Sequence, residues 1–155
     1  MKSKSKKEKK AKESSKKLVE KAGIAIKNEF YLEATMILST LFEKKLAKVI
    51  EKVEASVSEK GLTMSLMLRK IRKVHQSDTH DDLTKNFSLE LIDGIRTWKN
   101  KRNQVLKGLV VGNIKKVRLE HLSSEGIQLY KDLTKAAKTL KSSDEIPEVE
   151  GESRD

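Results

Sequence analysis

The amino-acid sequence predicts an all-α protein, built as a bundle of four to five helices between two charged tails. Three observations support this prediction. The chain of 155 residues is rich in Lys, Glu, Leu and Ala, it contains one proline and few glycines, and its apolar residues recur every three or four positions over several long segments. Alanine and straight side chains favour helices, and a single proline leaves little turn chemistry for a series of strands.

The first element is expected to be a disordered basic tail over residues 1–17. This segment holds nine lysines and two glutamates but almost no apolar residue, so it cannot bury enough surface to offset the entropy of ordering. A short helix is then predicted from Leu18 to Lys27, with Ser14 or Ser15 as its N-cap.

The clearest helix is predicted over residues 30–53. Its apolar residues are spaced by three or four and form one face of about six turns. These residues are Tyr31, Ala34, Leu38, Phe42, Leu46, Val49 and Val53. Lysines and glutamates between them are expected to form the solvated side.

Residues 55–61 interrupt this pattern, and another amphipathic helix is predicted over residues 64–74. Four basic residues cluster along it. These are Arg69, Lys70, Arg72 and Lys73. The following residues, 75–86, are rich in Ser, Asp, Thr and His, and we expect them to form a loop.

A further helix is predicted over residues 88–106. Ser88 is expected to be its N-cap, with Glu90 in the first turn, where the helix dipole favours an anion. Gly108 is expected to end it in a left-handed conformation.

Residues 109–112 are expected to form a short apolar connection, either a strand-like stretch or a buried loop. The last helix is predicted over residues 117–140. Gly126 lies inside this helix, where glycine costs about 1 kcal/mol relative to alanine. We therefore expect close packing at Gly126.

The C-terminal residues 142–155 are expected to form a second disordered tail, with six acids, one arginine and the only proline. The folded part is then one domain over residues 18–141. The formal net charge of +11 divides into +7 for the first tail, +9 for the domain and −5 for the second tail. A domain that is itself basic favours polyanionic partners such as RNA or DNA, with plain solubility as the alternative reason. The oppositely charged tails could also pair with each other.

Composition excludes several classes of site. The chain has no cysteine, which rules out disulfides, thiol catalysis and Cys-ligated zinc or iron–sulfur clusters. No apolar run approaches the roughly 20 residues that span a bilayer, and the lysine-rich start lacks the apolar stretch of a signal peptide. We expect a cytoplasmic protein with no membrane contact and no cofactor or metal.

One predicted helix face carries an unexpected charge. The residues that share this narrow arc at 3.6 residues per turn are Leu91, Ile95, Trp98, Arg102, Val105 and Leu109. Because an unpaired buried charge is costly, Arg102 either pairs with an acid from another helix or faces a cleft or partner. Asn103 adds a polar group beside it.

The segment from Trp98 to Lys107, with Arg102 and Asn103 inside it, resembles the signature of the HEPN (higher eukaryotes and prokaryotes nucleotide-binding) superfamily. In that signature an arginine, often followed by asparagine, precedes a histidine by four to six residues. A tryptophan four residues before the arginine, like Trp98, is common in prokaryotic members. The resemblance extends over roughly residues 28–140.

The resemblance implies a helical bundle that forms homodimers and brings two copies of the motif into one basic cleft. Many members are metal-independent ribonucleases of toxin–antitoxin and defence systems, and others are inactive binding modules. It further implies that Arg102 grips the scissile phosphate bidentately and that Asn103 positions the other groups. Lys99 and Lys101, beside the motif, and the cluster over residues 69–73 are candidate RNA-binding residues.

Lys107 departs from the family pattern, because it stands where the histidine would be. A lysine can bind phosphate or protonate a leaving oxygen, but it is a poor general base near neutral pH because it is almost fully protonated there. The substitution is open to three explanations: natural degeneration, an altered mechanism or an inactivating change.

Three functions follow as expectations. The first is a HEPN-like homodimer of toxin or defence type that binds RNA with weak or absent nuclease activity. The second is an active metal-independent endoribonuclease with Arg102, Asn103 and Lys107 as catalytic residues. The third is a non-enzymatic protein-interaction module that docks an antitoxin or other protein through the stripe with Trp98. A metal site at His75, His80, Asp81 and Asp82 is a weaker candidate.

Overall fold

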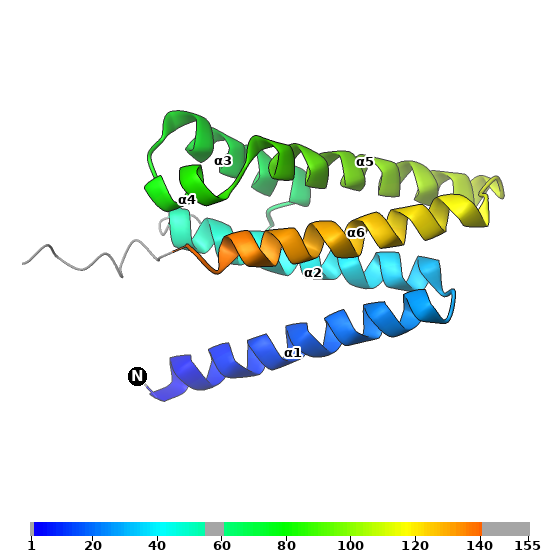
Figure 1. The fold of residues 1–155 in the computed structure, drawn as a ribbon, viewed down its shortest axis with the longest axis horizontal. Helices are drawn as coiled ribbons and strands as arrows, with labels where there is room; N and C mark the ends of the chain where they lie inside the picture. The colour runs from blue at the N-terminus through cyan, green and yellow to red at the C-terminus, as the bar shows by residue number, and fades with distance from the viewer. Residues whose placement is uncertain (1, 55–60, 141–155) are drawn as a thin grey trace, which may run out of the picture.

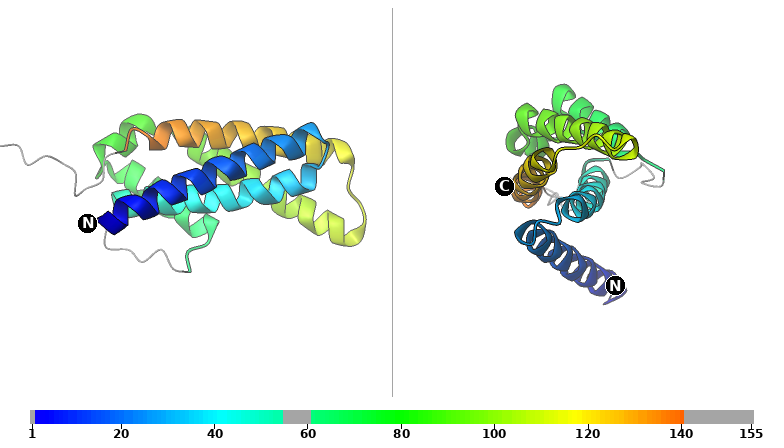
Figure 2. Two further views of the ribbon diagram at one scale, coloured as in Figure 1. Left: turned by 90° about the horizontal axis from the view of Figure 1, so that it is seen from below. Right: turned by 90° about the vertical axis from the view of Figure 1, so that its right-hand side faces the viewer.

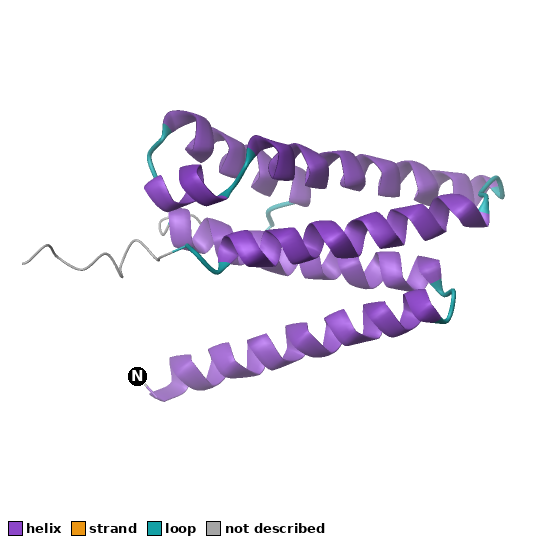
Figure 3. Cartoon of the chain, in the orientation of Figure 1, coloured by secondary structure: helices purple, strands orange, loops and turns teal. Residues whose placement is uncertain are grey.

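All the regular secondary structure in the described part of the chain is α-helical. The computed structural model describes residues 2–54 and 61–140, which form six α-helices and no strand (Figures 1 and 3). They are α1 (Lys2–Lys27), α2 (Tyr31–Val53), α3 (Met64–Ser77), α4 (Asp81–Asn86), α5 (Leu89–Val111) and α6 (Lys116–Ala137). The predicted all-α bundle is confirmed, with more helices than the four to five expected. The predicted C-terminal tail over residues 142–155 lies outside the described residues.

The helices form three layers. Helices α3 and α5 lie on one side, α2 and α6 in the middle and α1 on the opposite side, farthest from α5 (Figure 1). The end-on view agrees, with α1 on the outer side of the bundle (Figure 2). The largest fully buried side chains come from α2, α3, α5, α6 and the segment around α4, and they include Phe42, Ile71, Trp98, Phe87 and Leu133. These side chains belong to one hydrophobic core, to which the middle layer contributes.

The apolar face of α2 is buried as its spacing predicts. Leu38, Leu41, Phe42, Leu46, Val49 and Ile50 are all at most 1% exposed. Helix α3 buries Met67, Leu68, Ile71 and Val74 against the same core. The predicted helices over residues 30–53 and 64–74 are confirmed.

The expected disordered tail over residues 1–17 is wrong for the described residues, because α1 begins at Lys2 rather than at Leu18. Lysine, glutamate and alanine are good helix formers. Extending a helix that packing already holds gains one hydrogen bond for each residue fixed. Ala22 and Ala25 provide that packing because they are buried. Ser15, which lies one turn before the expected helix start at Leu18, is half-buried. Ser14 and Ser15 therefore lie inside the helix and do not cap it.

The expected loop over residues 75–86 is largely helical. Helix α3 continues to Ser77 and ends at Asp78, which has a left-handed φ of 51°. Helix α4 then begins after His80, whose Nδ1 accepts a hydrogen bond from the backbone of Leu83. Asp81 and Asp82 lie in the first turn of α4, where the helix dipole favours carboxylates.

The end of α5 also differs from the expectation. Ser88 caps its N-terminus as predicted, accepting from the backbone N–H of Leu91 at 3.0 Å. The helix passes Gly108 and includes residues 109–111, so the expected strand or buried loop is wrong. Gly112, with φ +77°, provides the left-handed end instead, and the backbone N–H of Asn113 donates to the carbonyl of Gly108. No residue between 108 and 111 forces an earlier stop.

Within the described residues, no helix is long and apolar enough to cross a membrane.

Candidate nucleic-acid interface

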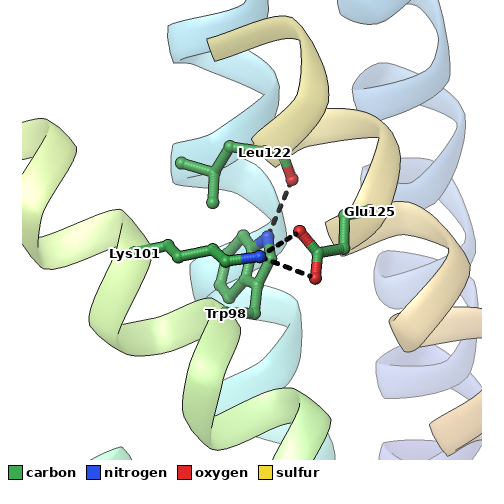
Figure 4. Close-up of polar contacts among 4 residues, drawn as sticks. All are labelled: Trp98, Lys101, Leu122 and Glu125. Atoms are coloured by element: carbon green, nitrogen blue, oxygen red, sulfur yellow. Dashed lines mark hydrogen bonds and ion pairs between the residues drawn. The ribbon is translucent and has the colours of Figure 1, made fainter. Parts of the chain in front are cut away.

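Trp98 anchors α5 to both α2 and α6. Its side chain is fully buried, and its ring centroid lies 4.9 Å from that of Phe42 on α2. Its indole Nε1 donates a 2.7 Å hydrogen bond to the backbone carbonyl of Leu122 on α6 (Figure 4). The buried polar atom of the indole is thus satisfied. These contacts fix the rotation of α5 and so decide where Arg102 and its neighbours point.

Gly126 makes the Trp98 contact possible. A Cβ at position 126 would lie 2.7 Å from the indole Nε1 and 2.8 Å from the adjacent ring carbon. Any larger residue would push the indole away from the Leu122 carbonyl. The prediction of close packing at Gly126 is confirmed, and it is Trp98 that fills the space.

Arg102 lies one turn beyond Trp98 on the same face of α5. Its guanidinium carbon is 6.0 Å from the centroid of the Trp98 ring, at the outer limit of a cation–π contact. Its Nε and Nη2 donate to the Oδ1 of Asn103 at 3.3 and 3.0 Å. Burial lowers the pKa of Arg102 from its ordinary value, and the nearby Glu43 opposes this shift. The side chain is half-buried and remains charged at neutral pH.

No ion pair to Arg102 forms within the described residues. The sequence raised two possibilities for Arg102. The first, an ion pair with an acid from another helix, is not formed among the described residues. Asn103 holds the guanidinium from one side and satisfies only part of its five N–H donors. The arrangement leaves donor capacity for an anionic ligand.

Asn103 and Lys107 occupy a different face of α5 from Arg102. Both are exposed, and their spacing of four residues places them on one face of the helix. Arg96 and Lys99 precede them at spacings of three or four residues and continue the same row. We call these four residues, Arg96, Lys99, Asn103 and Lys107, the α5 polar row.

A basic groove lies between α3 and the first half of the α5 polar row. It has a volume of about 220 Å³, and four cationic side chains line it together with one carboxylate, Asp93. The cationic residues are Arg69 and Arg72 of α3 and Arg96 and Lys99 of α5. Arg72 pairs with Asp93, and the Lys99 ammonium donates to the hydroxyl of Ser65. Positive charge therefore exceeds negative charge in this groove, which we call the α3–α5 groove.

The structure separates the remaining basic candidates from this groove. Lys101 forms an ion pair with Glu125 of α6 at 3.2 Å (Figure 4). Lys70 pairs with Glu54 at 3.7 Å, and Lys73 is exposed on α3 outside the groove lining. Arg69, Arg72 and Lys99 are thus brought together, whereas Lys70, Lys73 and Lys101 are not.

Arg96 is the cationic lining residue that the sequence interpretation missed. The signal was present as a repeated spacing, because Arg96 and Lys99 are three residues apart on α5, as Arg69 and Arg72 are on α3. A three-residue spacing places both members of a pair on one side of a helix. That the two pairs face each other across a groove depends on how the helices pack.

The histidines do not come together as a candidate site among the described residues. His80 caps α4 through its Nδ1, as described above. His121 is exposed on α6. The described residues contain no group of three or more His, Asp or Glu side chains that could hold a metal ion.

Comparison of the chain with models of protein families, with curated proteins and with solved structures gives no match.

Proposed function

We propose that this protein binds RNA as a HEPN-like homodimer of toxin or defence type, with weak or absent nuclease activity. The α3–α5 groove is the observation that carries the proposal, because it places Arg69, Arg72, Arg96 and Lys99 around one cavity. Clustered cations that follow a groove suit the regularly spaced phosphates of a nucleic acid. The resemblance of residues 98–107 to the HEPN signature supports RNA over other polyanions.

The half-buried Arg102 supports a phosphate-gripping role. Asn103 orients the guanidinium, and Trp98, fixed by the core, supports the turn of α5 that carries it. A preoriented guanidinium can bind a phosphate through two parallel hydrogen bonds. Lys107 contributes positive charge at the end of the α5 polar row but lacks the proton-transfer properties of a histidine.

Exposed apolar side chains at one end of the bundle support the homodimer. Val110 is 89% exposed and Val111 79% exposed at the end of α5, and Val117 is 58% exposed at the start of α6. Phe30, at 60%, belongs to the turn between α1 and α2, which lies at the same end of the molecule (Figure 1). We call these four residues the apolar end. A second copy that covered the apolar end would bring the C-terminal ends of the two α5 helices, and with them Lys107, toward each other.

Salt-dependent RNA binding tests the proposal. The double variant Arg69→Gln and Arg96→Gln removes two groove cations that form no ion pair within the described residues. We expect weaker binding of a labelled single-stranded RNA, and a salt dependence that falls by about 0.7 in log–log slope for each lost phosphate contact. Fluorescence anisotropy between about 50 and 200 mM salt measures both quantities.

The matched control is Arg118→Gln with Lys131→Gln, which removes the same charge from exposed positions on α6. This control should change RNA affinity much less than the groove variant. Equal losses in the two variants, or no loss in either, would contradict a role for the groove. Incubation of the natural protein with RNA and a metal chelator separates the binding protein from the active ribonuclease, and we expect negligible cleavage.

The interaction-module alternative loses its proposed docking residue. Trp98 is fully buried within its own chain and hydrogen-bonded to Leu122, so it is not available to a partner. A protein partner would have to use other residues.

A further inference from the structure

A second basic groove lies on the opposite side of the molecule from the α3–α5 groove. It has a volume of about 660 Å³ and lies between α1, α2 and α6. Six lysines line it: Lys12 and Lys16 of α1, Lys45, Lys48 and Lys52 of α2, and Lys138 after α6. We call it the lysine groove. The outer layer in Figure 1, formed by α1, is one of its walls.

Like charges crowd one another in the lysine groove. The pKa of Lys45 is lowered, first by burial and then by Lys48, Lys52, Lys12 and Lys138. Glu20 is the one carboxylate among the described residues of the lining. No ion pair joins any of the six lysines to a described carboxylate. The positive charge is therefore largely uncompensated by the described structure, and an anionic occupant would relieve it.

The floor of the lysine groove is apolar. Val19 of α1, Val49 of α2 and Tyr130 and Ala137 of α6 contribute to it. A groove with cationic walls and an apolar floor suits a peptide that carries both carboxylates and apolar side chains, because each kind of side chain then finds a matching surface. A nucleic-acid backbone would use the walls but has no aliphatic groups for the floor.

Residues 142–155 of this chain have that composition. They include six carboxylates, at Asp144, Glu145, Glu148, Glu150, Glu152 and Asp155, with Ile146, Pro147 and Val149 among them. Leu140, the last described residue before this segment, lies beside the groove. Lys52 donates to the backbone carbonyl of Leu140 at 3.5 Å, and Lys138 belongs to the lining.

We propose that the acidic segment 142–155 occupies the lysine groove of its own chain. Charge complementarity, the apolar floor and the position of Leu140 at the groove all support this occupant. Attachment at the groove gives the segment a local concentration of about 1 mM. Weak contacts that would be insufficient between separate molecules are then enough for occupancy. The proposal concerns a different surface from the α3–α5 groove and does not depend on RNA binding.

Competition with a labelled peptide tests the proposal. The probe is a fluorescent peptide with the sequence of residues 142–155, and it is added to two forms of the full chain. One form is natural, and the other carries Asn or Gln in place of the six carboxylates of its own segment. If the natural segment binds its groove with a Kd of about 0.1 mM, a local concentration of about 1 mM gives roughly 10-fold weaker peptide binding to the natural chain.

Variants of the groove locate the binding site. In the chain with the neutral segment, Lys45→Gln, Lys48→Gln and Lys52→Gln together should abolish peptide binding. The matched control, Arg69→Gln, Arg96→Gln and Lys99→Gln, removes the same charge from the α3–α5 groove and should leave peptide binding unchanged. A peptide with its six acids replaced by amides should not bind. Circular dichroism of each variant verifies that the helices remain.

Several results would overturn the proposal. Equal affinity of the peptide for the natural and neutral-segment chains would show that the segment does not fill the groove. Equal losses in the two triple variants would reduce the binding to general attraction between opposite charges. A third result would assign the groove to nucleic acid instead. In that case the peptide does not bind the unaltered groove, and the Lys45, Lys48 and Lys52 variant abolishes RNA binding.

Carbodiimide cross-linking of the natural chain gives a second measurement that needs no variant. This reagent joins a carboxylate to a lysine amine in direct contact. At low protein concentration, we expect links from the acidic segment to both walls of the groove, at Lys12 or Lys16 and at Lys45 or Lys48. Links to lysines outside the groove alone would overturn the proposal.

Discussion

At the scale of single residues, the contact of Trp98 with Gly126 determines how α5 and α6 approach each other. The indole fills the space that a side chain at position 126 would occupy, and its N–H reaches the carbonyl of Leu122. Arg102 then projects from a turn of α5 whose rotation this contact fixes. A residue with no side chain thereby supports the orientation of the candidate phosphate-binding arginine.

Gly126→Ala should destabilise the protein, because the new methyl group would overlap the Trp98 ring. Overpacking of a core contact typically costs about 1–3 kcal/mol of unfolding free energy. Gly23→Ala is the matched control, because a Cβ there meets nothing within 4 Å. In the interior of α1 it should stabilise by up to about 1 kcal/mol. Urea unfolding followed by Trp98 fluorescence measures both, and a loss of stability at position 23 alone would contradict the assignment.

Lys107→His should create or sharply raise RNA cleavage that needs no metal. Imidazole titrates near neutrality and can both accept and donate a proton, and such a group typically contributes about 10²–10⁴-fold. Gel analysis of RNA cleavage with a chelator present measures the gain. Arg102→Ala in the same chain should abolish the gain and weaken RNA binding.

The reverse pattern has a definite meaning. If the natural protein cleaves RNA well and Lys107→His reduces cleavage, lysine is the catalytic group and the protein is an active ribonuclease. If neither form cleaves and Arg102→Ala leaves RNA affinity unchanged, the motif has a structural role in this chain.

At the scale of the helices, α5 combines a core face with a polar row. Trp98 and Ile95 are buried toward α2 and α6, while Arg96 and Lys99 face α3 across the basic groove. Its ends are defined by local chemistry, with Ser88 as the N-cap and Gly112 as the left-handed residue after the last turn. The N-cap thus determines where α5 begins, two turns before the polar row.

Ser88→Ala should lower the stability of the protein by about 1 kcal/mol, because the backbone N–H of Leu91 loses the hydroxyl that accepts its hydrogen bond. Ser124→Ala is the control, because Ser124 is exposed within α6 and alanine is the better helix former there. Thermal unfolding followed by circular dichroism compares the two. Equal destabilisation by both substitutions would argue against the cap.

At the scale of the whole molecule, basic surfaces lie on two opposite sides of the bundle. The apolar end lies at one end of the bundle axis. The α3–α5 groove and the lysine groove are separated by the middle layer of α2 and α6 (Figure 1). Each groove has an excess of positive charge, with four cations against Asp93 in the α3–α5 groove and six lysines against Glu20 in the lysine groove. This arrangement allows one basic surface to bind a polyanion while the other binds the acidic segment of the same chain.

Dimer formation through the apolar end is tested by Val110→Lys together with Val111→Lys. Both side chains are highly exposed, so the substitutions should not disturb folding, whereas two buried lysines in an interface would be strongly unfavourable. We expect light scattering to give a dimer for the natural chain at tens of micromolar and a monomer for the variant. Leu66→Lys on α3, at an exposed position, should leave the dimer intact. A natural chain that is monomeric at this concentration would contradict the proposal.

The sequence by itself determined the all-α fold class and the longest apolar-faced helices, but not α4, which was expected to be a loop. The spacing of apolar residues predicted α2 and α3 and the buried positions Ile95, Trp98 and Val105 of α5, and Ser88 was identified as a cap. These features depend on residues within one turn or one helix face, so local rules suffice. The local rules failed where alternatives were close in free energy. The lysine-rich start of α1 could be coil or helix, and α5 could end at Gly108 or at Gly112.

Only the tertiary structure decided which charged residues act together. Arg69 and Arg96 face the same groove, whereas Lys101 pairs with Glu125 and Lys70 pairs with Glu54. The burial of Trp98 within its own chain was also decided at this level. The physical reason is that a helix's own sequence specifies which residues share a face, but not which other helix that face meets. That choice depends on long-range packing, such as the fit of Trp98 over Gly126.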